Sequence, residues 1–286
     1  MKKEDIARES LKYNFLRRII IRFDYEGMND IELDKILPDI SVELRKHNYR
    51  NRTDEKAREV EIRFDDPEKA EYDDICQKNV REQRIIVFHN ENPQVKLKMS
   101  TTSACISIEK TKYVDCLTYC GILWQVMQII INSSEKVPFF SLKRFGLRKI
   151  NQCFLKDIQL LNEYFEPAHF RVFRLSEDRV TANKVMQLKD SFECGKYNVN
   201  LVRTIIKGEI QGEKAYQLNY DADIYLMDEE HIEELLREAD TINQMNKILF
   251  DLYKDAVTEK FLNQLIDGTF EQDVILGVDA NEEDRV

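Results

Sequence analysis

The alternation of apolar and polar residues in short runs constrains the fold of this chain more than any other feature. At the centre of its 286 residues, Leu147 and Lys149 alternate with Arg148 and Ile150 just after Gly146. Successive side chains of a strand point to opposite faces, so this alternation predicts a strand. Further strands are predicted at 14–23, 60–64, 84–89, 95–100, 104–110, 170–175, 180–189, 197–207 and 215–226.

Helical spacing of apolar residues appears in four places between these runs. Residues 31–46 follow an N-cap at Asn29 or Asp30, and Pro38 inside them predicts a kink or two pieces. Residues 47–57 are polar and are predicted to form a loop. The other predicted helices are 114–132, 157–165 and roughly 229–265, where a change from mixed spacing to spacing by fours leaves open whether the last is one helix or two.

The order of these elements predicts an α+β fold with two similar halves, each a mainly antiparallel sheet covered by a long helix. The expected organisation is a mobile N-terminal segment at 1–13, a first half at 14–138, a second half at 139–269, and an acidic disordered tail at 270–286. The two halves share no letter-by-letter repeat, so internal duplication is inferred from the order of elements alone.

Charge and composition narrow the class of protein. The formal net charge of -10 opposes non-specific binding to nucleic acid or anionic lipid, because that binding needs clustered basic residues. We find no signal-peptide pattern and no apolar run long enough to span a membrane. Six scattered cysteines without an export signal indicate reduced thiols, so a cytoplasmic protein that does not bind membranes is expected.

Two segments carry a resemblance to a known family. Residues 14–23 resemble the opening strand, and residues 144–151 the central Gly-Leu-Arg-x-Ile-Asn motif, of a sporadically distributed bacterial family of unknown function. The helix around 245–265 is similar to the family's closing helix. Lys149 stands where the family usually has Tyr, and Arg17 lies near its usual acidic residue. The resemblance implies a fold, and its scattered distribution implies cargo of mobile or antiphage-defence cassettes.

Asp221 and Asp223 form the sharpest metal-like pattern in the sequence. Residues i and i+2 of a strand project from one face, so both carboxylates are placed to hold one hard cation such as Mg²⁺ or Mn²⁺. With Glu209 or Glu213 from a neighbouring strand, they would form the site of a metal-dependent phosphodiesterase or nuclease. The competing interpretation is a solvated strand face in an acidic protein, with no catalytic residue, metal or other cofactor.

Basic residues cluster beside the first strand and in the central motif. If the fold brings them together, Arg17, Arg22, Arg144, Arg148 and Lys149 would form a positive patch for phosphate or for an acidic partner. The competing interpretation is that these residues pair with the surplus of Asp and Glu. Arg148 is the strongest candidate for an anion contact or a structural role.

No Gly-rich nucleotide loop, nucleophile elbow or paired-histidine motif occurs in the sequence. We therefore expect a non-enzymatic interaction protein, a component or regulator of a bacterial defence-type system, that binds a protein partner. That partner could also be a second copy of the chain, which would make a homodimer. Two competing functions are the metal-dependent phosphodiesterase or nuclease and a non-catalytic nucleic-acid binder, which the acidic composition disfavours.

Overall fold

The computed structural model describes residues 3–63, 77–109, 116–133, 135–170, 185–210, 212–227, 232, 239–269 and 274–276. Its α-helices are α1 (Asp30–Lys46), α2 (Cys116–Ile131), α3 (Leu161–Tyr164), α5 (Ala239–Ala256) and α6 (Glu259–Asp267). Its strands are β1 (Leu16–Glu26), β2 (Tyr49–Arg63), β3 (Gln77–Asn90), β4 (Val95–Met99), β5 (Ser103–Glu109), β6 (Ser141–Leu155), β7 (Val185–Cys194), β8 (Tyr197–Ile210), β9 (Glu213–Leu226) and β10 (Val274–Leu276). The mixed α+β class predicted from the sequence is confirmed.

The strands form one large sheet whose order is β2-β3-β4-β5-β1-β6-β9-β8-β7, with β10 on β6. The pairs β2–β3, β3–β4, β6–β9, β7–β8 and β8–β9 are antiparallel, as expected. Two similar halves with long covering helices stay a prediction. The contacts define two compact units: unit 1 is Met1–Ile21, Ile108–Leu117 and Arg144–Val286, and unit 2 is Arg22–Ser107 and Thr118–Lys143.

In unit 2, α1 begins and packs as its sequence predicts. The side chain of Asn29 accepts a hydrogen bond from Glu32 N, and the Glu32 carboxylate accepts one from Asn29 N, which is a capping box. The buried face of α1 consists of Leu33, Ile36, Leu37, Ile40 and Leu44. Pro38 lies on the exposed side within one continuous helix, so the alternative of two helical pieces is wrong.

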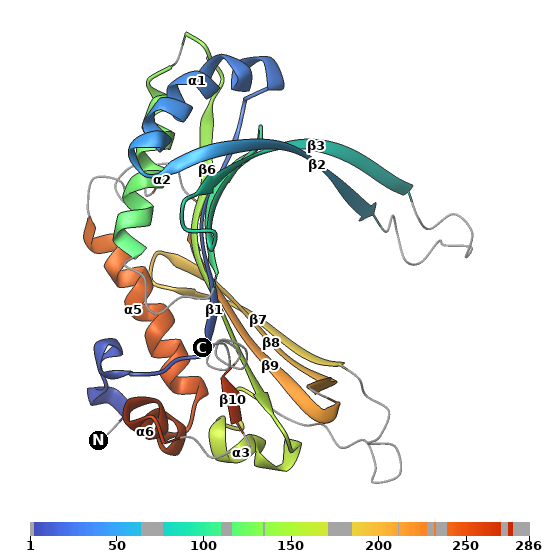
Figure 1. Ribbon diagram of the computed structural model, residues 1–286, viewed down its shortest axis with the longest axis vertical. Helices are drawn as coiled ribbons and strands as arrows, with labels where there is room; N and C mark the ends of the chain where they lie inside the picture. Colours follow the sequence, from blue (N-terminus) through green and yellow to red (C-terminus); the bar gives the residue numbers. More distant parts are fainter. Residues whose placement is uncertain are drawn as a thin grey trace. The chain divides into compact units, whose positions relative to one another are not determined.

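The predicted loop at 47–57 is wrong, because β2 already begins at Tyr49. The left-handed residue Asn48, with φ 66°, connects the end of α1 to this strand. Residues 50–56 are exposed, so the strand buries neither face there and shows no apolar alternation. In Figure 1, β2 and β3 extend together as a curved ribbon away from the other strands of unit 2.

In unit 1, α5 lies along one face of the strands, and the N-terminal turns lie beside it (Figure 1). The core near α6 is aromatic: Phe15 stacks on Phe261 at 5.6 Å between ring centroids, and Phe165 meets Phe261 edge-on. Helix α5 ends at Ala256, and Thr258 caps the start of α6 by accepting a hydrogen bond from Phe261 N. The predicted segment 229–265 is therefore two helices over its described part.

Several predictions lie partly or wholly outside the described residues. They are the strand at 170–175 beyond Phe170, the first residues of the strand at 180–189, most of 229–238, and the tail at 270–286 apart from β10. Residues 3–13 include two short 3-10 turns, at Lys3–Asp5 and Arg8–Ser10, and Ile6 between them is buried. The mobility and the domain boundaries expected from the sequence stay predictions.

Candidate functional site

Strand β6 carries the central motif and sends its basic residues to two different faces of unit 1. Leu147, Lys149 and Asn151 are buried, whereas Arg148 between them is exposed. This is the direct result of strand geometry, because neighbouring side chains point to opposite faces. Arg148 and Lys149 therefore belong to different surfaces although they are adjacent in the sequence.

The face of the sheet that carries Arg148, which we call the open face, has two ion pairs between β6 and β9. Arg148 donates from Nε to Asp221 Oδ1 at 2.7 Å and from Nη2 to Asp221 Oδ2 at 2.5 Å. Arg144 donates from Nη2 to Asp223 Oδ2 at 2.5 Å, and its guanidinium lies 4.4 Å from the ring centroid of Tyr225. Both carboxylates of the metal-like pattern thus bind arginines.

Burial and charge act on these groups in opposite directions. Burial raises the pKa of Asp223, while the positive charges of Arg144 and Arg148 lower it by less. The hydrogen bonds to Asp221 raise the pKa of Arg148. Asp221 and Asp223 each contact an arginine directly, so a cation would have to displace those contacts before it could bind.

The third predicted acidic ligand lies at a different place along the sheet. Glu209 pairs with Lys214 near the end of the β8–β9 hairpin, whereas Asp221 pairs with Val202. Seven residues along β8 separate Glu209 from Val202, which corresponds to roughly 23 Å of strand. Among the described residues, no three His, Cys, Asp or Glu side chains are grouped so that they could hold a metal ion.

Polar contacts continue from β9 across the open face to β8 and β7. Asn200 donates from Nδ2 to the Tyr225 hydroxyl at 3.4 Å, and Ser191 donates from Oγ to Asn200 Oδ1 at 2.7 Å. Further along β6, Gln152 donates to Asn219 Oδ1 at 3.1 Å. On this face the polar side chains of β6, β7, β8 and β9 are therefore joined by hydrogen bonds and ion pairs.

The remaining predicted basic residues are distributed as follows. Arg22, in unit 2, is exposed and donates from Nε to Asp24 Oδ1 at 2.6 Å. Arg17 is half-buried in unit 1, and its Nη1 is buried without a hydrogen-bond partner among the described residues. The structure brings Arg144 and Arg148 together through their aspartates, and it places Lys149 on the opposite side of β6.

Lys149 is buried, with 8% of its surface exposed, and donates from Nζ to Asn246 Oδ1 on α5. Burial lowers its pKa to about 8; Cys116 acts in the opposite direction, and the positive charge of Arg8 adds a still smaller lowering. The sequence did not identify Arg8, Asn246 or Tyr253 as its neighbours. The only signal for this location was the alternation that puts Lys149 on the same face as Leu147.

In the part of the chain that the structure describes, no helix combines the length and the apolar character needed to cross a membrane.

The resemblance to the bacterial family stays a prediction from the sequence. A comparison with protein-family models gives no match, and a comparison with curated proteins gives no significant match either.

Proposed function

We propose that this chain is a non-enzymatic interaction protein that binds a partner protein through the ribbon formed by β2 and β3. The observation that carries the proposal is the length of this ribbon beyond the rest of the sheet. Its register runs from Tyr49 opposite Asn90 to Arg63 opposite Gln77. Strand β4 pairs with β3 only from Ile86 to His89, so residues 77–85 pair with β2 alone among the described strands.

A two-stranded ribbon is marginally stable by itself in water, because it has few residues on which to pack. Strand β2 is also an edge of the described sheet, so one side of its backbone is available for hydrogen bonds. A partner that adds a strand to this edge, or covers a face of the ribbon, would supply what the ribbon lacks. We therefore assign the contact with the partner to β2–β3.

Charge favours a protein over a nucleic acid at the base of the ribbon. Arg84 binds Asp54 at 2.7 Å and Asp34 at 2.8 Å, and Arg50 binds Glu91 at 2.8 Å. Basic and acidic groups thus alternate and neutralise one another here. A surface for the phosphate backbone needs uncompensated basic residues instead.

The setting of this interaction follows from the sequence alone. The family resemblance supports a component or regulator of a bacterial defence-type system, and the six scattered cysteines, if reduced, fit a cytoplasmic location. Two similar halves derived by internal duplication belong to the same proposal. A second copy of the chain is the alternative partner.

The test is a variant that lacks the outer ribbon. Lys56 and Arg84 lie opposite each other, so an Asn-Gly turn can join them in place of residues 57–83. The tagged full chain and the variant are recovered from native host cells, and protein, nucleic acid and metal are quantified in the same samples. We expect a stoichiometric partner protein with the full chain and at least a tenfold smaller amount with the variant.

The matched control shortens a hairpin of unit 1. Lys207 and Tyr216 also lie opposite each other, so an Asn-Gly turn in place of residues 208–215 removes a hairpin end without changing the ribbon. The control should retain the partner, and purified partner should then bind the full chain and the control with equal Kd. Equal recovery by the ribbon variant, or nucleic acid as the stoichiometric component, would refute the proposal.

A further inference from the structure

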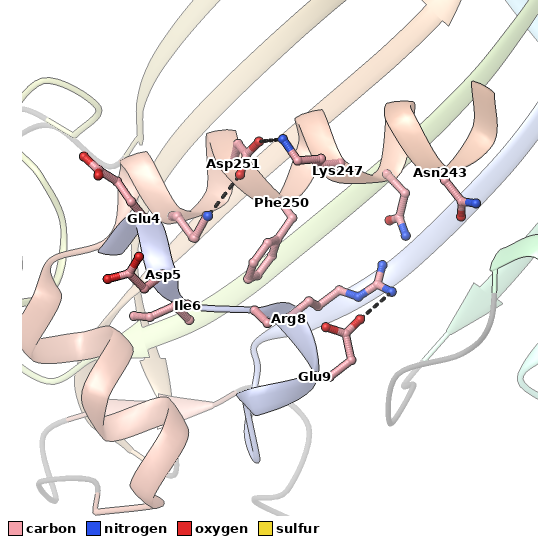
Figure 2. A pocket seen from close by; sticks show the side chains of 12 residues that line it. Glu4, Asp5, Ile6, Arg8, Glu9, Asn243, Lys247, Phe250 and Asp251 are labelled. Carbon is pink, nitrogen blue, oxygen red and sulfur yellow. Dashed lines mark hydrogen bonds and ion pairs between the residues drawn. The ribbon is translucent and has the colours of Figure 1, made fainter. Parts of the chain in front are cut away.

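Two neighbouring cavities lie between the N-terminal segment and α5, both within unit 1. The larger has a volume of about 350 Å³ and the smaller about 70 Å³, and Arg8 and Phe250 line both. Figure 2 shows Phe250 pointing from α5 toward the N-terminal segment, where the Arg8 guanidinium pairs with the Glu9 carboxylate. The smaller cavity reaches Lys149 on β6 and Tyr253 on α5.

The smaller cavity contains a buried cation beside a neutral partner. The Lys149 ammonium donates to the amide oxygen of Asn246, and no described carboxylate lies within ion-pair distance of it. Burying a charge is costly unless an opposite charge is close. Since the chain has 53 acidic and 43 basic residues, a carboxylate beside this lysine would have been readily available.

A second buried residue that lines this cavity has an unused hydrogen-bonding group. Tyr253 is 6% exposed, and its hydroxyl has no hydrogen-bond partner among the described residues. Buried hydroxyl groups are normally paired, so an unpaired one indicates a missing acceptor. The ammonium of Lys149 and the hydroxyl of Tyr253 are both donors, and both residues line the same cavity.

We propose that these two cavities bind a small organic acid, with its carboxylate in the smaller cavity between Lys149 and Tyr253. A volume of about 70 Å³ corresponds to roughly two water molecules, which is the size of a carboxylate group. The apolar remainder of the ligand lies along Phe250 in the larger cavity. The lining residues belong to unit 1 and the ribbon to unit 2, so this inference does not rest on the proposed partner protein.

Protonation supports the assignment. Among the described residues, the charged or titratable groups that act on Lys149 are Arg8 from the N-terminal segment and Cys116 from α2, and Tyr253 from α5 lines the same cavity. Burial brings the pKa of Lys149 to about 8, and burial raises that of Tyr253 well above its ordinary value. At neutral pH, Lys149 is thus mostly charged and Tyr253 keeps its proton, which is the state that binds an anion.

The experiment is calorimetric titration of the full chain with benzoate at pH 7, with benzamide and inorganic phosphate as comparison ligands. Benzamide has the shape of benzoate without its charge, so we expect it to bind at least tenfold more weakly. Lys149→Gln should weaken benzoate binding at least tenfold, and Tyr253→Phe roughly three- to tenfold. Lys214→Gln, which removes an exposed charge of unit 1 from the β8–β9 hairpin end and touches neither cavity, should leave the affinity unchanged.

Proton uptake gives a readout that needs no variant. Benzoate favours charged Lys149, so binding at pH 8 should take up about half a proton, and binding at pH 6.5 almost none. Titrations in two buffers with different ionisation enthalpies measure this number. If Lys149→Gln does not fold, proton uptake and Tyr253→Phe carry the test.

Four results would overturn the proposal: no saturable benzoate binding, equal binding of benzamide, no proton uptake at pH 8, or tighter binding of phosphate than of benzoate. An equal loss of affinity in Lys214→Gln and Lys149→Gln would also overturn it, because surface charge would then explain the attraction.

Discussion

The Arg148 guanidinium on β6 binds both carboxylate oxygens of Asp221 on β9, at 2.7 and 2.5 Å. A bidentate contact of this kind fixes the geometry of both side chains. It connects the central sequence motif to the first aspartate of the acidic pattern, 73 residues later, while Arg144 binds the second aspartate, Asp223.

The free-energy coupling between these two residues can be measured directly. The side chain of Arg148 is 44% exposed, so solvent screens the pair, and we expect a coupling of about 1 kcal/mol. The measurement is a double-mutant cycle of Arg148→Ala and Asp221→Ala by urea unfolding. The exposed pair Lys247–Asp251 serves as the control and should give about 0.3 kcal/mol. Strictly additive single variants at 148 and 221 would contradict the prediction.

Metal binding should not depend on Asp223. Arg144 binds this carboxylate at 2.5 Å, so Mg²⁺ or Mn²⁺ would have to compete with a fixed guanidinium. We expect the wild-type chain and Asp223→Ala to show the same weak affinity for Mn²⁺ in calorimetric titrations. Site-specific binding that disappears in Asp223→Ala, together with Mn²⁺-dependent cleavage of nucleic acid, would instead establish the nuclease function.

Replacing Lys149 should stabilise the fold at neutral pH. Its pKa falls from 10.5 to about 8 on folding, so below pH 8 the folded state carries a burial penalty of about 3 kcal/mol. The unfolded chain binds more protons between pH 8 and 10.5, so stability rises with pH across that window. Lys149→Met removes the penalty and loses one hydrogen bond to Asn246, which gives a net gain of about 2 kcal/mol at pH 7.

Urea unfolding of Lys149→Met and the wild-type chain at pH 7 and pH 9.5 checks this prediction. The difference between the two proteins should shrink at the higher pH, because wild-type Lys149 is then mostly neutral. A difference that grows toward pH 9.5 would show that the lysine gains stabilisation from its charge. Residues that bind ligands often lower the stability of the folded protein, so a stabilising replacement of Lys149 would agree with a ligand-binding role.

Gly27 should be among the least replaceable residues of unit 2. Its φ is +80°, and an added Cβ would lie 1.8 Å from the carbonyl oxygen of Phe139. Gly27→Ala therefore forces the backbone to move, and we expect a loss of more than about 2 kcal/mol. Gly195→Ala is the matched control, because φ is +62° there with no atom near the added Cβ, and it should cost about 1 kcal/mol. Equal melting temperatures for the two variants would contradict the prediction.

The sequence predicted elements well wherever one face is buried. The helix at 31–46 was recognised because its apolar residues recur at helical spacing, and of the two predicted caps, Asn29 and Asp30, the structure has Asn29. Apolar residues occur on more than one side of α2, so the sequence did not show which face packs: Leu117 and Ile131 are partly exposed, whereas Leu123 and Val126 are buried. The beginning of β2 was missed because a ribbon with two exposed faces has no apolar alternation.

The candidate site was predicted in part. The prediction placed Arg148 and Lys149 in one basic patch because both are basic. Neighbouring residues of a strand point to opposite faces, so the sequence already indicated that these two side chains lie on different faces. The partners of each residue could not be predicted. Asn246 lies 97 residues after Lys149, and only the packing of α5 on the sheet brings them together.

The alternation along β6 has a consequence for insertions and deletions. Adding one residue to this strand before Arg148 would turn the guanidinium inward and place the Lys149 ammonium among the aspartates of β9. Adding two would restore both orientations but shift every pair with β9 by two positions. Only an even number of added or removed residues therefore keeps both side chains of this strand on their own faces. The β2–β3 ribbon has no such requirement along residues 50–56, because these residues are exposed on both faces.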